Sequence, residues 1–158
     1  MSASMLDKNT LWRQIRRARS RMTEMEVVVG IQEGVKSDDG NAMVAEYAAM
    51  NEYGTEKIPS RPFMRTAFDN NTEKIFQSFY RQRVAMDEGK ITQEQALNRV
   101  GLKIQAMVKD SITRGGWVPN SPKTIKAKGE GKPPLIDSST MLKSITYTVQ
   151  PYGTSKDE

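Results

Sequence analysis

The chain has 158 residues, with 24 Lys and Arg against 19 Asp and Glu, which gives a formal net charge of +5. It contains no Cys and no His, so disulfide bonds, thiolate or imidazole metal ligands and all catalysis by these residue types are excluded. This length fits one domain with arms, and no apolar run approaches the ~20 residues of a membrane span. We therefore expect a soluble protein without a membrane partner, whose mild positive charge favours acidic partners.

The first predicted element is a helix over residues 10–22. Apolar residues from Leu11 to Met22 recur at three- and four-residue spacing, which places them on one face. Arginines occupy the other faces, so residues 1–24 form either a solvated helical arm or a basic arm that touches DNA or an acidic neighbour. The candidate contact residues of this arm are Arg13, Arg16 and Arg17.

The next segments predict a strand and a short helix. Residues 25–32 (MEVVVGIQ) are short and β-branched, and the glycine- and aspartate-rich turn of residues 33–41 follows them. The Ala-rich residues 42–51 predict a helix that Gly54 is placed to end.

Two longer helices are predicted in the middle of the chain. Pro62 suits the first turn of a helix that runs to about Met86. Thr92 and Gln95 form a capping box that starts the second helix, and the Gly115–Gly116 pair ends it. The stripe of the first helix is expected to face the core and comprises Phe68, Thr72, Ile75, Phe76, Phe79, Tyr80 and Val84. That of the second comprises Leu97, Val100, Ile104, Met107, Val108 and Ile112.

Residues 115–134 predict a long flexible loop, because they are rich in Pro, Gly and Lys and contain almost nothing apolar to bury. Trp117 beside the lysines could stack on a base while they grip phosphates. Alternatively, the loop becomes ordered only against a partner subunit. The lysines expected to face a partner or DNA are Lys123, Lys126, Lys128 and Lys132.

The C-terminal part predicts a second strand. Asp137 is expected to cap a short helical turn through Leu142, and residues 144–150 (SITYTVQ) alternate between apolar and polar side chains. The two strands could pair in one small antiparallel sheet with helices on one face, which is an α+β arrangement. We expect a single α+β domain over residues 25–152 and a disordered tail over residues 153–158.

Enzyme signatures are absent from the sequence, which has no phosphate-binding loop, no GxSxG and no zinc spacing. Carboxylate catalysis by Glu46, Glu52 or Asp137 stays open, but nothing in their spacing pairs them. We expect neither an enzyme nor a bound cofactor or metal.

Several blocks stand in a fixed order along the chain: NEYGT at residues 51–55, IPSRPFMR at 58–65, PNSP at 119–122, PLIDS at 134–138 and MLKSITYTV at 141–149. This series resembles the tail-component proteins of long-tailed bacteriophages and prophages, which act at the neck in head–tail joining or tail completion. In that family an NEFGT block leads into IPxRPF, and a PLIDTG block opens the last strand. Here Tyr53 stands where Phe is usual, and Ser138–Ser139 stand where Thr-Gly is usual.

The resemblance implies a structural virion protein of the tail or neck, assembled in the host cytoplasm as rings of identical subunits that bind neighbouring virion proteins. The expected protein-interface residues are Tyr53, Arg61, Phe63, Arg65 and Trp117. For Phe63 and Tyr53 the alternative is that they only pack the turn onto the domain. The alternative function is a small basic DNA-binding protein that uses the Arg-rich helix and the Lys-rich loop.

Overall fold

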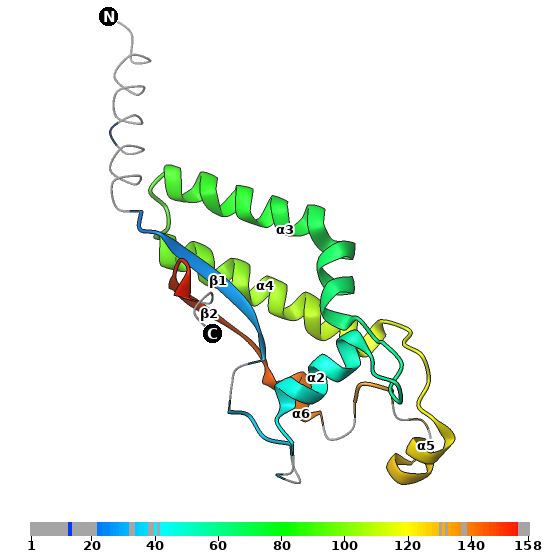
Figure 1. The fold of residues 1–158 in the computed structure, drawn as a ribbon. Coiled ribbons are helices and arrows are strands. Elements are labelled where there is room, and N and C mark those ends of the chain that lie inside the picture. The colour runs from blue at the N-terminus through cyan, green and yellow to red at the C-terminus, as the bar shows by residue number, and fades with distance from the viewer. Residues whose placement is uncertain are drawn as a thin grey trace, which may run out of the picture. The chain divides into compact units, whose positions relative to one another are not determined.

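The computed structural model describes residues 13, 22–31, 34–37, 40, 42–129, 131, 133–136 and 139–154. Its elements, in chain order, are β1 (Met25–Ile31), α2 (Val44–Tyr53), α3 (Phe63–Asp87), α4 (Gln93–Arg114), α5 (Pro122–Lys128), α6 (Thr140–Ser144) and β2 (Ile145–Pro151) (Figure 1). The predicted contacts Arg16, Arg17 and Lys132, the predicted cap Asp137 and the side chain of Lys128 lie outside the described residues. Among the described helices, none is both long enough and apolar enough to cross a bilayer.

The two strands pair in an antiparallel sheet, although they come from opposite ends of the sequence. Where the pairing begins, the amide of Tyr152 donates to the carbonyl of Glu24 at 3.0 Å. The helices α3 and α4 pack together, so the predicted α+β fold with a small sheet and two long helices is confirmed.

Local signals set the ends of two helices as predicted. Gly54 ends α2 with a φ of 79°, and its amide donates to the carbonyl of Met50. Before α4 the capping box is complete: Thr92 Oγ1 accepts from the Gln95 amide at 3.2 Å, and Gln95 Oε1 accepts from the Thr92 amide at 3.1 Å. These bonds satisfy amides that a helix N-terminus otherwise leaves unpaired.

The chain divides into two compact units, and each long helix contributes to both. The core-poor unit comprises Met1–Val28, Glu73–Lys103 and Thr148–Glu158, and the core-rich unit comprises Val29–Thr72 and Ile104–Tyr147. Among the described residues of the core-poor unit, the buried apolar side chains are Ala96 and Val100. Those of the core-rich unit are Val44, Ala48, Phe63, Ala67, Ile104, Val108, Ile112, Leu135, Met141 and Ile145.

The two long helices differ in how well their stripes were predicted. The stripe of α4 is confirmed, since Val100, Ile104, Val108 and Ile112 are all buried. The stripe predicted for α3 is wrong, because five of its large side chains are exposed and Ile75 is only half-buried. The exposed ones are Phe68, Phe76, Phe79, Tyr80 and Val84. Beyond the buried Phe63 at its start, the buried residues of α3 are small, namely Ala67 and Ser78. Small side chains let a neighbouring helix approach closely and leave the bulky ones on the opposite side.

The segment over residues 115–134 was predicted as a loop but contains the helix α5. Ser121 caps this helix by accepting from the Thr124 amide at 3.3 Å, and Pro122 occupies its first turn. After it, Leu135 is buried. The following helix α6 begins at Thr140, three residues beyond the predicted cap.

Candidate protein interaction site

Most of the predicted interface residues lie where α2 ends and α3 begins, within the core-rich unit. The chain doubles back tightly there: the Thr55 amide donates to the Ile58 carbonyl at 2.8 Å, and Thr55 Oγ1 accepts from the Ile58 amide at 3.0 Å. A Cβ added at Gly54 would lie 2.9 Å from the backbone nitrogen of Ser60. Gly54 also has a positive φ, so both space and conformation require glycine at this turn.

Glu52 supplies the N-terminal cap of α3 from the end of α2. Glu52 is only 6% exposed, and its carboxylate accepts from the amides of Met64 at 2.8 Å and Arg65 at 3.0 Å. The first amides of a helix have no partner within the helix and carry a partial positive charge, so a carboxylate suits them. The carboxylate also accepts from Arg65 Nε at 3.0 Å, while the Glu52 carbonyl accepts from the Ser60 hydroxyl. Glu52 therefore joins two helices and the turn between them.

Arg61 is a buried cation, 5% exposed, that neutral acceptors hold. Its Nη1 donates to Asn51 Oδ1 at 3.0 Å, its Nε to the Val118 carbonyl at 2.9 Å, and its Nη2 to the Pro119 carbonyl at 3.3 Å. Among the described residues, no carboxylate lies within 4.0 Å of it. Burial lowers the pKa of the Arg61 guanidinium because its charged form loses water, but an arginine keeps its proton at neutral pH.

Two of the expected interface residues therefore belong to the interior of the chain. Phe63 is 2% exposed, and its carbonyl accepts from the Ser111 hydroxyl at 2.8 Å. Arg61 links α2 to the segment after α4. The side chains of Arg61 and Phe63 are both buried within the chain. The expectation that both are exposed for contact with a partner is therefore corrected. For Phe63 the burial supports the alternative of packing the turn.

Tyr53 and Arg65 form the exposed part of the same corner. Tyr53 is 72% exposed, and the guanidinium carbon of Arg65 lies 5.2 Å from the centre of its ring, within cation–π range. Arg65 is held in this position because Glu52 accepts from it twice, through a carboxylate oxygen and through the backbone carbonyl at 2.9 Å. The aromatic ring and the cation are thus displayed by a fixed framework.

The other predicted contacts lie elsewhere in the chain. Trp117 is half-buried, its Nε1 donates to the Ser111 carbonyl at 3.0 Å, and a Cβ at Gly115 would overlap its ring. The indole is therefore held against the end of α4.

Lys123 and Lys126 are exposed on α5, and Arg13 is exposed in the N-terminal segment. Their contact with DNA or a partner stays a prediction.

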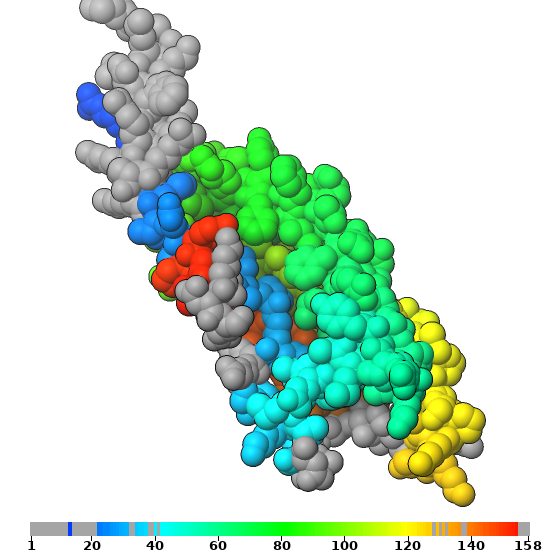
Figure 2. All heavy atoms as spheres, in the orientation of Figure 1, coloured from blue at the N-terminus to red at the C-terminus, as the bar shows by residue number. Residues whose placement is uncertain are grey.

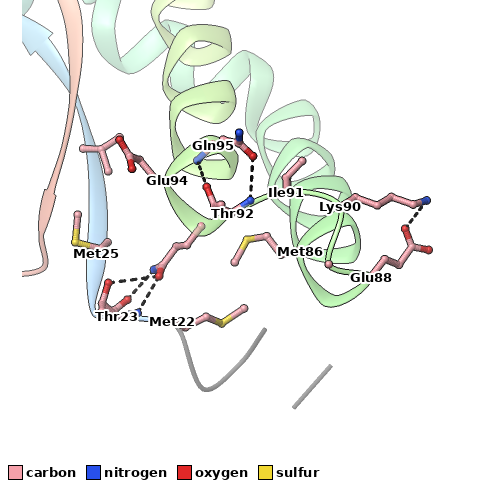
Figure 3. Close-up of a pocket in the computed structure, with 13 residues that line it drawn as sticks. Met22, Thr23, Met25, Met86, Glu88, Lys90, Ile91, Thr92, Glu94 and Gln95 are labelled. Carbon is pink, nitrogen blue, oxygen red and sulfur yellow. Dashed lines mark hydrogen bonds and ion pairs between the residues drawn. The ribbon is translucent and has the colours of Figure 1, made fainter. Parts of the chain in front are cut away.

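The core-poor unit contains an open cavity of about 740 Å³ near the start of α4 (Figure 3). Methionine side chains contribute much of its apolar lining, from Met22, Met25 and Met86. Gln93 also lines the cavity, and its side chain accepts from the Thr23 amide at 2.8 Å and donates to the Thr23 carbonyl at 2.6 Å. These polar groups satisfy each other and so are already engaged within the chain.

Sequence reasoning missed that Asn51 and Glu52 are buried polar residues around which this corner is organised. Glu52 was considered only as a candidate catalytic carboxylate, whereas all of its contacts described above are structural. Glu46, another such candidate, is exposed, and Asp137 lies outside the described residues. In the described part of the chain, no three His, Cys, Asp or Glu side chains gather as a metal site would need.

No family model, curated protein sequence or solved structure matches this chain. The resemblance to phage tail-component proteins therefore depends on the ordered sequence blocks.

Proposed function

We propose that this chain is a structural protein of phage virion morphogenesis. It completes the tail or joins the tail to the head by binding copies of itself and neighbouring virion proteins. It would belong to the tail or neck of the virion after assembly in the host cytoplasm. The proposal is supported by the ordered series of sequence blocks, and one observation from the structure adds to that support.

That observation is the physical dependence of the blocks on one another. Asn51 and Glu52, from the first block, bind Arg61 and Arg65, from the second. Arg61 also donates to Pro119, in the third. A buried polar group costs about 1–3 kcal/mol when its partner is lost, so these three of the five blocks depend on one another. Their joint occurrence is thus better explained as one signature than as separate chance matches.

The corner built from these blocks is suited to binding another protein. Tyr and Arg are enriched among the residues that contribute most to binding at the centres of interfaces, and holding them in place beforehand reduces the entropy lost on binding. Tyr53 and Arg65 meet both conditions, because one is widely exposed and the other is fixed by Glu52. The partner surface that fits them offers an apolar recess beside a carboxylate.

Electron microscopy of lysates after deletion of this gene from its prophage tests the function. Filled heads lying apart from free tails, or tails of abnormal length, would support joining or completion. Normal infectious particles would reject the proposal and favour the DNA-binding alternative.

A substitution at the exposed corner tests the site. Tyr53→Ala should complement the deletion poorly while the protein stays folded, because Tyr53 is 72% exposed. Tyr152→Ala is the matched control, since Tyr152 is also exposed but belongs to the core-poor unit. Equal yields of infectious particles from both variants would show that the corner does not make the contact.

A further inference from the structure

The outer face of α3 in the core-poor unit carries large side chains that are exposed in the described part of the chain. Phe76, Phe79, Tyr80 and Val84 are all exposed, and they follow one another at helical spacing. We call these four residues the aromatic face. In Figure 2 the spheres of α3, drawn in green, form part of the surface. Single exposed apolar residues are ordinary, but a contiguous face of them marks an interaction site.

The same unit is short of core. Its buried apolar side chains among the described residues are Ala96 and Val100, whereas Phe76 is 70% and Tyr80 is 65% exposed. Interfaces of permanent homodimers resemble a domain core cut in half. A unit with a thin core and an aromatic outer face fits that description.

Charges flank the aromatic face in an order that is complementary to itself. Glu73 and Arg83 lie five residues on either side of Ser78, while Phe76 and Tyr80 lie two residues on either side of it. Two copies of this segment can lie antiparallel, with the two-fold axis passing between their aromatic faces at the height of Ser78 along the helix. Phe76 of one copy then faces Tyr80 of the other. Glu73 of one copy then faces Arg83 of the other.

We propose that the occupant of the aromatic face is a second copy of this chain, bound antiparallel through α3. A two-fold contact requires a surface that complements itself, and Glu73 with Arg83 provides this beside the aromatic residues. The same register sets Asp69 of one copy against Asp87 of the other farther from the axis, where Asp87 is paired with Arg83 of its own copy. A parallel arrangement would instead set each charge against its own kind. The contacts that Glu73 and Arg83 make within their own chain do not prevent this pairing between copies. Gln77 donates to Glu73 at 2.8 Å and Arg83 pairs with Asp87 at 3.1 Å, but both contacts are exposed and exposed pairs are weak.

This contact does not depend on the proposed virion function. A two-fold contact closes on itself, so it produces a dimer and no ring. It would hold in solution for the full chain whatever the chain assembles with later.

Sedimentation equilibrium of the full chain over a wide range of concentration tests the proposal. The wild type should form a dimer, and Phe76→Glu should raise its dissociation constant by about thirtyfold or more, as expected at the centre of an interface. Leu102→Glu is the control, because Leu102 is 59% exposed on the other long helix, and it should leave the constant unchanged. A wild type that stays monomeric, or a dimer unaffected by Phe76→Glu, would overturn the proposal.

A charge exchange tests the antiparallel arrangement. Glu73→Arg and Arg83→Glu should each weaken the dimer, because each sets like charges opposite one another. The double variant should regain most of the lost affinity, since both pairs are then reversed together. Circular dichroism would verify that all variants keep their helix content. Two weakening single variants without recovery in the double, or growth into larger assemblies that Phe76→Glu abolishes, would reject the two-fold contact.

Discussion

The two units of this chain place their polar and apolar residues in opposite ways. In the core-rich unit a cation and a carboxylate are buried, and each is surrounded by hydrogen-bond partners. In the core-poor unit aromatic side chains are exposed, and among its described residues the buried apolar ones are Ala96 and Val100. The core-rich unit satisfies its buried polar groups with partners from the same chain, whereas the core-poor unit exposes aromatic side chains.

The contrast between the two units suggests that they contribute to assembly in two ways, one through recognition of a partner and the other through self-association. The buried polar network of the core-rich unit fixes the geometry of a small exposed corner, Tyr53 and Arg65, which suits recognition of a partner. The aromatic face of the core-poor unit is larger and less specific in chemistry, which suits self-association. Variants in the two units should therefore fail in different ways.

The largest effect is expected at Arg61. Arg61→Glu places a negative charge among the carbonyls of Val118 and Pro119, which now accept from the guanidinium. We expect a loss of roughly 3–5 kcal/mol in the free energy of unfolding, as for other broken buried charge sites. An arginine at an exposed interface could be replaced with the fold intact. Because Arg61 is buried, we expect its replacement to destabilise the fold instead.

Urea unfolding followed by circular dichroism measures this loss. Arg114→Glu is the control, because Arg114 and its partner Asp110 are both exposed, and it should cost less since exposed ion pairs contribute little. An Arg61→Glu protein as stable as the wild type would mean that the network does not hold the corner together.

The next effect is expected at Glu52. Glu52→Gln keeps the shape but replaces one acceptor oxygen by an NH₂ group, which would face an amide donor of α3. A loss of about 1–3 kcal/mol follows from the unsatisfied donors. Glu46→Gln, on the exposed side of the same helix, should change stability by no more than about 0.5 kcal/mol. Equal stabilities of the two variants in urea would contradict the capping role.

Elements with local signals were predictable from sequence. The β-branched run gave β1, the capping box gave the start of α4, and Gly54 gave the end of α2. Each of these signals acts within a few residues, so a single sequence contains it. The helix α5 also had such a signal, since Ser121 and Pro122 form a cap and a first turn, but the lysine-rich composition obscured it.

Features that depend on distant partners were not predictable. Apolar spacing shows that α3 is helical, but it does not show which side meets α4. That choice depends on the fit of small residues such as Ala67 and Ser78. Burial of Arg61 depends on carbonyls nearly sixty positions later in the chain, and no local pattern contains them. Of the predicted interface residues at this corner, Tyr53 and Arg65 are therefore exposed and Arg61 and Phe63 are buried, and binding of a partner by the exposed pair stays a prediction.

A smaller effect is expected at the start of α4 in the core-poor unit. Thr92→Ala removes the hydroxyl that accepts from the Gln95 amide, and loss of such a cap costs about 1 kcal/mol. Thr113→Ala is the control near the other end of this helix, where the hydroxyl only bonds back to carbonyls of its own helix. Thermal unfolding should show a lower midpoint for Thr92→Ala alone. Equal midpoints would mean that this end of α4 is held by its other contacts.

The smallest effect is expected at Phe76, provided that the protein is dilute. A core position would cost roughly 3–5 kcal/mol on truncation to alanine, but Phe76 is 70% exposed, so Phe76→Ala should cost no more than about 0.5 kcal/mol in the monomer. At high concentration the two proteins should diverge, because dimer formation stabilises only the folded state and raises the melting temperature of the wild type. Thermal unfolding at several concentrations separates the two contributions. A large loss in dilute solution would place Phe76 in a core and remove the contrast between the two units.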